Sequence, residues 1–167
     1  MKYLVTGSKS GLGRYLVEIF NGTGFDRDDY LPQEADVIIH CAFHPAKDYQ
    51  SENIDDVIVE DLALVKELTQ LSHKLFIFIS SIEVNSMNSL YAKAKKRSED
   101  IVKKYAKSYL ILRPSAMLGE YSRPNSLIKM RDGDCKLSLS VNSIMNYILH
   151  KDIGSFIDYA VKNKVTG

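Results

Sequence analysis

The chain has 167 residues, of which 45% are hydrophobic and 26% are charged, and its formal net charge is +1. This composition predicts one globular domain, and the near-neutral charge without a basic stripe gives no indication of nucleic-acid binding. No stretch has the length of a membrane span, no signal-peptide pattern follows Met1, and the two cysteines indicate no disulfide framework, so we expect a cytoplasmic protein that does not bind membranes.

The chain opens with a short apolar run that breaks into three closely spaced glycines. Residues 2–6 have the pattern of a buried strand, and residues 11–21 have that of a helix. A turn of this kind lets the backbone approach a pyrophosphate and aims the N-terminus of the helix at its charge. The alternative is a plain strand–turn–helix. The residues predicted to contact a dinucleotide are Gly7, Ser8, Lys9, Ser10, Gly11, Leu12 and Gly13.

Two other glycine-rich motifs do not fit this run. The phosphate loop of nucleoside triphosphatases needs Gly, four residues and then Gly-Lys-Ser or Gly-Lys-Thr, and the sequence contains no such run. The nucleophile elbow of hydrolases has a serine midway between two glycines, whereas Lys9 occupies that place here. The pattern therefore favours a dinucleotide.

Strand-like and helix-like runs alternate along the rest of the chain. We expect strands at 37–42, 75–80, 109–113 and 136–141, and helices at 54–72, 90–105 and 151–161. Residues 21–36 are too few for the strand, helix and strand that usually follow the first helix, so only one short strand fits, around 24–26. The sequence thus predicts an α/β fold with a doubly wound, mostly parallel sheet that is one strand short on the adenosine side.

A serine, a tyrosine and a lysine are candidates for proton transfer. Tyr91 and Lys95 are four residues apart on an expected helix, so their side chains share one face. A nearby ammonium lowers the pKa of a phenol, which prepares the phenol to exchange a proton. Ser81 follows a strand at its carboxyl end, where parallel sheets bind ligands. The alternative for Tyr91 and Lys95 is an ordinary helix start with a solvated lysine.

Five motifs in order resemble the short-chain dehydrogenase/reductase superfamily. Their order and spacing are similar to those of its extended branch, the nucleotide-sugar epimerases, dehydratases and 4-keto reductases. The motifs are Thr6-Gly7-x-x-x-Gly11-x-Gly13, Asp36-Val37-Ile38-Ile39-His40-Cys41-Ala42, Phe78-Ile79-Ser80-Ser81-x-Glu83-Val84, Tyr91-x-x-x-Lys95 with Glu99, and Leu112-Arg113-Pro114 with Gly119.

The resemblance implies a fold, a cofactor and a reaction. Residues 1–167 would form a single Rossmann-like NAD(P)-binding domain, with 114–150 as a reduced substrate-binding lobe. Tyr91 would exchange a proton with a sugar carbon's oxygen, Lys95 would hold the nicotinamide ribose, and Ser81 would orient the substrate. Two helices (54–72 and 90–105) resemble the pair that forms homodimer contacts in the family. Further cofactor contacts would come from Cys41, Ala42, Phe43, Ser80 and Pro114.

Cofactor choice rests on charges near the adenosine. Asp26 at the end of the short second strand would favour NAD, whereas Lys9 and Arg27 would attract the 2′-phosphate of NADP, which we slightly favour. The histidines show no metal-ligand spacing, so no metal site is predicted. The missing strand, the short segment between Ser81 and Tyr91, and the replacement of the asparagine usual in the family by the run Val57-Ile58-Val59 favour the alternative of a catalytically inactive NAD(P)-binding module. A scaffold that binds no dinucleotide is a third alternative.

Overall fold

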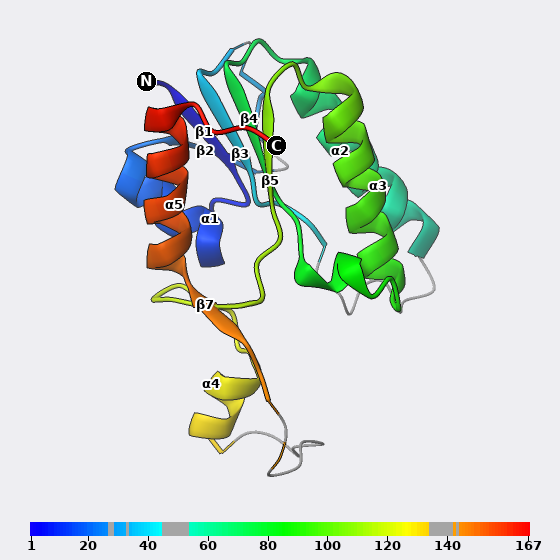
Figure 1. Ribbon diagram of the computed structural model, residues 1–167, viewed down its shortest axis with the longest axis vertical. Coiled ribbons are helices and arrows are strands. Elements are labelled where there is room, and N and C mark those ends of the chain that lie inside the picture. The colour runs from blue at the N-terminus through cyan, green and yellow to red at the C-terminus, as the bar shows by residue number, and fades with distance from the viewer. Residues whose placement is uncertain (27–28, 33, 45–53, 134–141, 143) are drawn as a thin grey trace.

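A five-stranded parallel sheet with the order β2-β1-β3-β4-β5 forms the centre of the molecule (Figure 1). The computed structural model describes residues 1–26, 29–32, 34–44, 54–133, 142 and 144–167. The strands are β1 (Tyr3–Thr6), β2 (Thr23–Phe25), β3 (Val37–His40), β4 (Leu75–Ile79) and β5 (Tyr109–Leu112). The predicted α/β fold with a doubly wound parallel sheet is therefore confirmed.

Helices cover both faces of this sheet. Helices α1 (Gly11–Phe20) and α5 (His150–Asn163) lie on one face, and α2 (Ile54–Gln70) and α3 (Leu90–Tyr105) lie on the other (Figure 1). Each face buries its own apolar cluster, one around Leu16 and Ile157, the other around Val65 and Val102. All five residues of β4 are buried, as expected for a strand with helices on both sides.

The edge of the sheet beside β1 is short. Strand β2 has three residues and pairs with β1 in parallel, and within the described residues no strand lies beyond it. The length of the connection had predicted this, because residues 21–36 have room for one short strand only. The described part contains no helix with both the length and the apolar character needed to cross a membrane.

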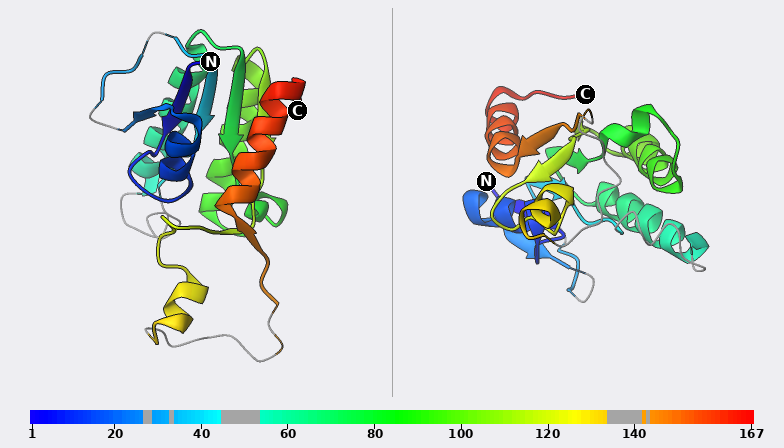
Figure 2. Two further views of the ribbon diagram at one scale, coloured as in Figure 1. Left: turned by 90° about the vertical axis from the view of Figure 1, so that its left-hand side faces the viewer. Right: turned by 90° about the horizontal axis from the view of Figure 1, so that it is seen from below.

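A second, small sheet lies beyond the carboxyl edge of the main one. Strand β6 (Ala116–Leu118) pairs in parallel with β7 (Tyr147–Leu149), and α4 (Ser126–Arg131) projects away from the domain (Figure 2). The sequence analysis missed these elements because three-residue strands carry no measurable periodicity. The strand expected at 136–141 lies outside the described residues.

Several elements end earlier than their apolar runs predicted. Strand β3 ends at His40 rather than residue 42, because the N–H groups of Cys41 and Ala42 donate to the Thr6 hydroxyl (3.1 and 3.0 Å) instead of continuing the ladder.

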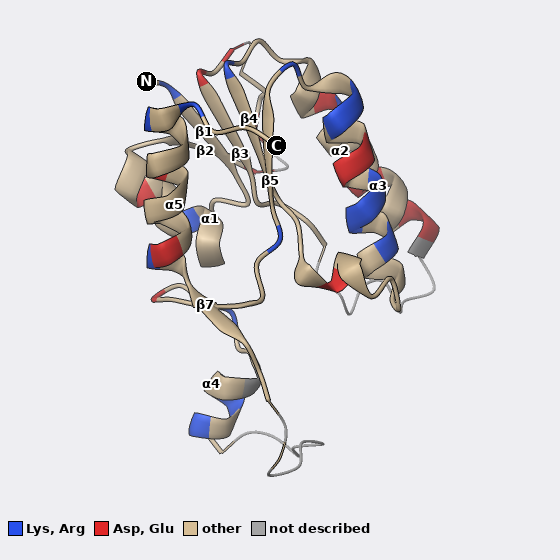
Figure 3. Cartoon of the chain, in the orientation of Figure 1, with Lys and Arg blue, Asp and Glu red and all other residues tan. Residues whose placement is uncertain are grey.

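Charged residues of both signs are interspersed on α2 and α3 (Figure 3). These two helices pack together, and the expected dimer through them stays a prediction.

Candidate active site

The glycine turn brings the start of α1 against β1 and β3. Gly7 has a φ of +71°, a region that favours glycine, and a Cβ there would lie 3.0 Å from the Ala42 nitrogen. A Cβ on Gly13 would lie 2.2 Å from the Gly7 carbonyl oxygen. Neither position tolerates a side chain, so the turn between β1 and α1 presents its backbone at Gly7 and Gly13. The glycine spacing predicted this close backbone packing.

A buried threonine and histidine fix the loop that faces this turn. The Thr6 hydroxyl accepts the N–H groups of Cys41 and Ala42, so its own proton is donated to Nδ1 of His40 at 2.7 Å. Burial, and then the nearby Lys95, lower the pKa of His40 to about 3. Burial raises the pKa of the Cys41 thiol to about 12. Both side chains are therefore neutral near pH 7.

Helix α3 presents Tyr91 and Lys95 to the same space. Ser89 caps the helix by accepting the N–H of Ala92 (3.0 Å), which places Tyr91 in the first turn. Lys95 is only 3% exposed; its Nζ donates to the Ile79 carbonyl oxygen (2.9 Å) and lies 3.7 Å from the centroid of the Phe43 ring. Burial lowers the pKa of Lys95 to about 7, so the ammonium and the amine are both populated near neutral pH.

The expected lowering of the tyrosine pKa is wrong for this arrangement. The pKa of Tyr91 is raised, first by burial and then by the carboxylates of Glu83 and Asp61. Lys95 does not compensate because its nitrogen is directed to the Ile79 carbonyl, 5.8 Å from the centroid of the Tyr91 ring. Tyr91 is therefore a neutral phenol here, and it holds its proton more tightly than an unperturbed tyrosine does.

The two serines after β4 have different surroundings. Ser80 is buried and donates to Oε1 of Glu99 (2.7 Å). Burial alone would raise the pKa of Glu99, but hydrogen bonds from Arg113 and Ser80 outweigh it and lower the pKa. Ser81 instead caps the short helix η2 (Ile82–Asn85), accepting the N–H of Glu83 (3.2 Å), and is not part of the cavity wall.

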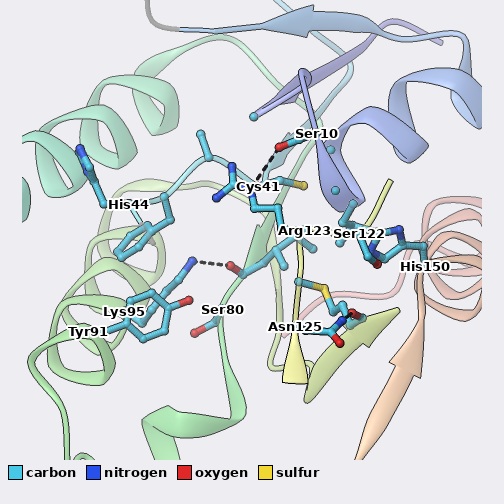
Figure 4. A pocket seen from close by; sticks show the side chains of 18 of the residues that line it. Ser10, Cys41, His44, Ser80, Tyr91, Lys95, Ser122, Arg123, Asn125 and His150 are labelled. Carbon is cyan, nitrogen blue, oxygen red and sulfur yellow. Dashed lines mark hydrogen bonds between the residues drawn. The ribbon is translucent and has the colours of Figure 1, made fainter. Parts of the chain in front are cut away.

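A cavity of about 320 Å³ joins the glycine turn to the start of α3 (Figure 4). Tyr91, Lys95 and Ser80 lie on one side of it, and Ser122, Asn125 and His150 lie opposite. The predicted residues in its wall are Gly7, Ser10, Gly11, Leu12, Gly13, Cys41, Ala42, Phe43, Ser80, Tyr91 and Lys95. Those that the sequence analysis missed are His44, Ile79, Met117, Ser122, Arg123, Pro124, Asn125 and His150.

Five further residues that the sequence predicted for the site do not line this cavity: Ser8, Lys9, Asp26, Ser81 and Pro114. Ser8 donates to Asp26 (2.6 Å) at the end of β2, beside Asp29, which accepts the N–H of Asp26 (2.8 Å). The carbonyl of Pro114 accepts the N–H of Ile82 (3.0 Å). Neither Lys9 nor Ser81 lines the cavity, and Arg27 lies outside the described residues.

The segment after β6 lies across the glycine turn. The Gly11 N–H donates to the Tyr121 carbonyl (2.8 Å), and Nε of Arg123 donates to the Ser10 hydroxyl (3.2 Å; Figure 4). No sequence signal marks this approach, because the contacting residues are more than 100 positions apart. Among the described residues, no three His, Cys, Asp or Glu side chains gather to hold a metal ion.

The sequence from residue 23 to residue 166 matches the model of the NAD dependent epimerase/dehydratase family. The chain belongs to this family. The match covers most of the chain, so the resemblance seen in the five motifs is confirmed. No curated protein matches the chain significantly.

Solved structures of sugar-modifying enzymes share the fold. A dTDP-4-dehydrorhamnose reductase from Clostridium acetobutylicum is 20% identical with a TM-score of 0.80, over all of this chain and 72% of that one. A tyrosine-to-phenylalanine mutant of UDP-glucuronic acid 4-epimerase from Bacillus cereus, solved with UDP-4-deoxy-4-fluoro-glucuronic acid and NAD, is 17% identical with a TM-score of 0.74, over 97% of this chain and 73% of that one. The capsular polysaccharide assembling protein CapF from Staphylococcus aureus is 20% identical with a TM-score of 0.67, over 97% of this chain and 50% of its own. The chain thus spans half the length of CapF.

Proposed function

We propose that this chain is an NAD(P)-dependent epimerase, dehydratase or reductase that acts on a nucleotide sugar or a related small carbonyl or alcohol compound. The observation that carries the proposal is the single cavity whose wall contains both the glycine turn and the Tyr91–Lys95 pair. Residues 114–150 would serve as a reduced substrate-binding lobe, because Ser122 and Asn125 enter the wall from that segment.

The cavity suits a dinucleotide by shape and by charge. Residues of the glycine turn line the cavity, and the first N–H groups of a helix have no intrahelical acceptor. The Gly11 N–H donates to the Tyr121 carbonyl (2.8 Å), so a pyrophosphate would take the place of that carbonyl. The described wall contains the cationic side chains Lys95 and Arg123 and no aspartate or glutamate. A polyanionic ligand would therefore meet positive charge along the cavity.

A bound nicotinamide would supply hydride transfer, and the side chains would supply proton transfer and orientation. Tyr91, a neutral phenol, would donate its proton to a substrate carbonyl oxygen and recover it from the product hydroxyl in the reverse direction. Lys95 would hold the nicotinamide ribose, for which its Nζ would have to leave the Ile79 carbonyl. Ser81 would need to turn from its capping position to orient the substrate, and Ser80 is held by Glu99.

The adenosine end of the chain supports NAD over NADP. Asp26 directly follows β2 and accepts a hydrogen bond from the Ser8 hydroxyl, and Asp29 accepts the N–H of Asp26. A carboxylate at this point accepts a hydrogen bond from a ribose 2′-hydroxyl, whereas two carboxylates together repel a 2′-phosphate. The expected preference for NADP came from Lys9, which is exposed and, like Asp26, outside the cavity wall, and from Arg27, which lies outside the described residues. We therefore propose NAD as the preferred cofactor.

A second candidate is an NAD(P)-binding module without catalysis. Two observations favour it: the pKa of Tyr91 is raised rather than lowered, and Ser81 is outside the cavity wall. Such a module would bind the cofactor and turn over no sugar nucleotide.

Cofactor titration and one substitution separate these candidates. The chain has no tryptophan, so the fluorescence of NADH or NADPH reports binding without interference. We expect micromolar affinity for NADH and weaker binding of NADPH. Tyr91→Phe should keep NADH affinity within about twofold, because the lost hydroxyl serves the substrate, and reduce turnover of nucleotide sugars by about 10²-fold or more.

Each outcome selects one candidate. Turnover by the wild type that Tyr91→Phe abolishes supports the enzyme. NADH binding without turnover of any nucleotide sugar supports the module. If folded wild-type protein binds neither NADH nor NADPH, both candidates are wrong and the scaffold alternative stands.

A further inference from the structure

A buried carboxylate on α2 binds the loop that follows β3. Asp61 is 4% exposed although it belongs to a helix at the surface of the domain. Its two oxygens accept the backbone N–H of His44 (3.3 and 3.2 Å), and Oδ1 lies 2.9 Å from Nδ1 of the same residue. An ionised carboxylate only accepts hydrogen bonds, so the His44 ring donates from Nδ1. One aspartate thus binds both the main chain and the side chain of His44.

The residue before His44 contacts both members of the catalytic pair. The Phe43 ring lies 3.7 Å, at its centroid, from Nζ of Lys95, and it meets the Tyr91 ring edge-on at 5.7 Å. An ammonium over an aromatic face is attracted to it, and more strongly where water is excluded. The position of Phe43 therefore affects how Lys95 and Tyr91 are held.

We propose that Asp61 is a positioning residue of the active site: by binding His44 it holds the Phe43 ring against Lys95 and beside Tyr91. The inference rests on the proposed function for the chemistry of Tyr91 and Lys95, but the contacts themselves do not depend on it. In the sequence Asp61 is one of several acidic residues on the helix at 54–72, and only the fold directs it inward.

The charge of Asp61, as well as its position, affects Lys95 and Tyr91. The carboxylate raises the pKa of Lys95 against the effect of burial, and it raises the pKa of Tyr91. It therefore favours an ammonium and a neutral phenol, the form of the pair that donates a proton to a carbonyl. The other titratable groups around Lys95 are His40 and Cys41 from the β3 side and Tyr91 and Glu99 on α3.

The test measures the pH at the midpoint of the Lys95 titration by NMR. In protein labelled with ¹³C-lysine, the one resonance that titrates near pH 7 is assigned by its loss in Lys95→Ala. Asp61→Asn keeps an oxygen for His44 but removes the charge, so the Lys95 midpoint should fall below 7 by about one pH unit. Asp56→Asn removes a charge from an exposed position on the same helix and should leave the midpoint unchanged.

Two further variants test the route through the loop. Phe43→Leu removes the aromatic face and should also lower the Lys95 midpoint. His44→Ala removes the ring bound to Asp61, so the Phe43 ring resonances should shift; this variant also keeps the proposal testable if Asp61→Asn does not fold. An unchanged Lys95 midpoint in folded Asp61→Asn, or unchanged Phe43 resonances in His44→Ala, overturns the proposal.

NADH titration of the same proteins separates this proposal from the proposed function. If the folded wild type binds neither NADH nor NADPH while the Lys95 midpoint responds to Asp61→Asn and the Phe43 resonances respond to His44→Ala, the proposed function is wrong and the positioning role stands. If the wild type turns over a nucleotide sugar, Tyr91→Phe abolishes this turnover and the Lys95 midpoint does not respond, the positioning role is wrong and the proposed function stands.

Discussion

Arg123 lines the cavity but was not among the residues that the sequence predicted. It reaches from the segment after β6 to the Ser10 hydroxyl of the glycine turn, with its guanidinium at the wall of a cavity that has no carboxylate among its described lining residues. An arginine in that place offers several N–H donors to a phosphate. We infer that it takes part in binding the cofactor's pyrophosphate.

Replacing this arginine should weaken cofactor binding. Arg123→Gln removes the charge but keeps a polar side chain, so the Kd for NADH should rise about tenfold, the effect of losing one charge-assisted hydrogen bond. The measurement is a titration by NADH fluorescence at two salt concentrations. Arg131→Gln is the matched control, because Arg131 is exposed on α4 and paired with Asp132 (2.7 Å). Equal affinities of Arg123→Gln and the wild type would show that Arg123 does not contact the cofactor.

At the scale of the element, the start of α3 decides where Tyr91 and Lys95 lie. Ser89 accepts the N–H of Ala92, and without this cap that donor loses its partner. Ser89→Ala should therefore lower the free energy of unfolding by about 1 kcal/mol, measured by urea denaturation. Ser89→Thr keeps a hydroxyl that can accept from the Ala92 N–H and donate to Oε2 of Glu83 (3.3 Å), and it should stay near the wild type. A loss of equal size in both variants would mean that something other than capping is involved.

What the sequence predicted about the elements depends on local information. The glycine turn, the two long helices and the Tyr91–Lys95 spacing follow from residues close together in the chain, and the structure has each of them. The contact of Arg123 with Ser10 and that of Asp61 with His44 depend on how distant segments meet, which no periodicity encodes. The direction of the Tyr91 pKa shift was wrong because burial, a property of the whole fold, outweighs the neighbouring lysine.

At the scale of the whole molecule, buried His40 links stability to pH. The ring is 1% exposed, its Nδ1 accepts the proton of the Thr6 hydroxyl (2.7 Å), and the pKa of His40 in the folded chain is about 3 against 6.5 for an unperturbed histidine. Between these values the unfolded chain binds a proton that the folded chain does not. Stability contributed by the neutral ring is therefore intact above pH 6.5 and decreases as the pH falls below it.

The size of this decrease can be measured by urea denaturation at pH 7.5 and pH 5.5. One pH unit below 6.5, His40 alone should cost the wild type about 1.4 kcal/mol. Burial lowers the pKa values of Lys95 and His150 as well, which adds loss in the same direction, whereas the stabilised carboxylate of Glu99 titrates below this window. His40→Gln can still bond to Thr6 but takes up no proton, so its loss over the same interval should be smaller by about 1.4 kcal/mol. If the variant and the wild type lose the same stability, protonation of His40 is not what destabilises the fold in mild acid.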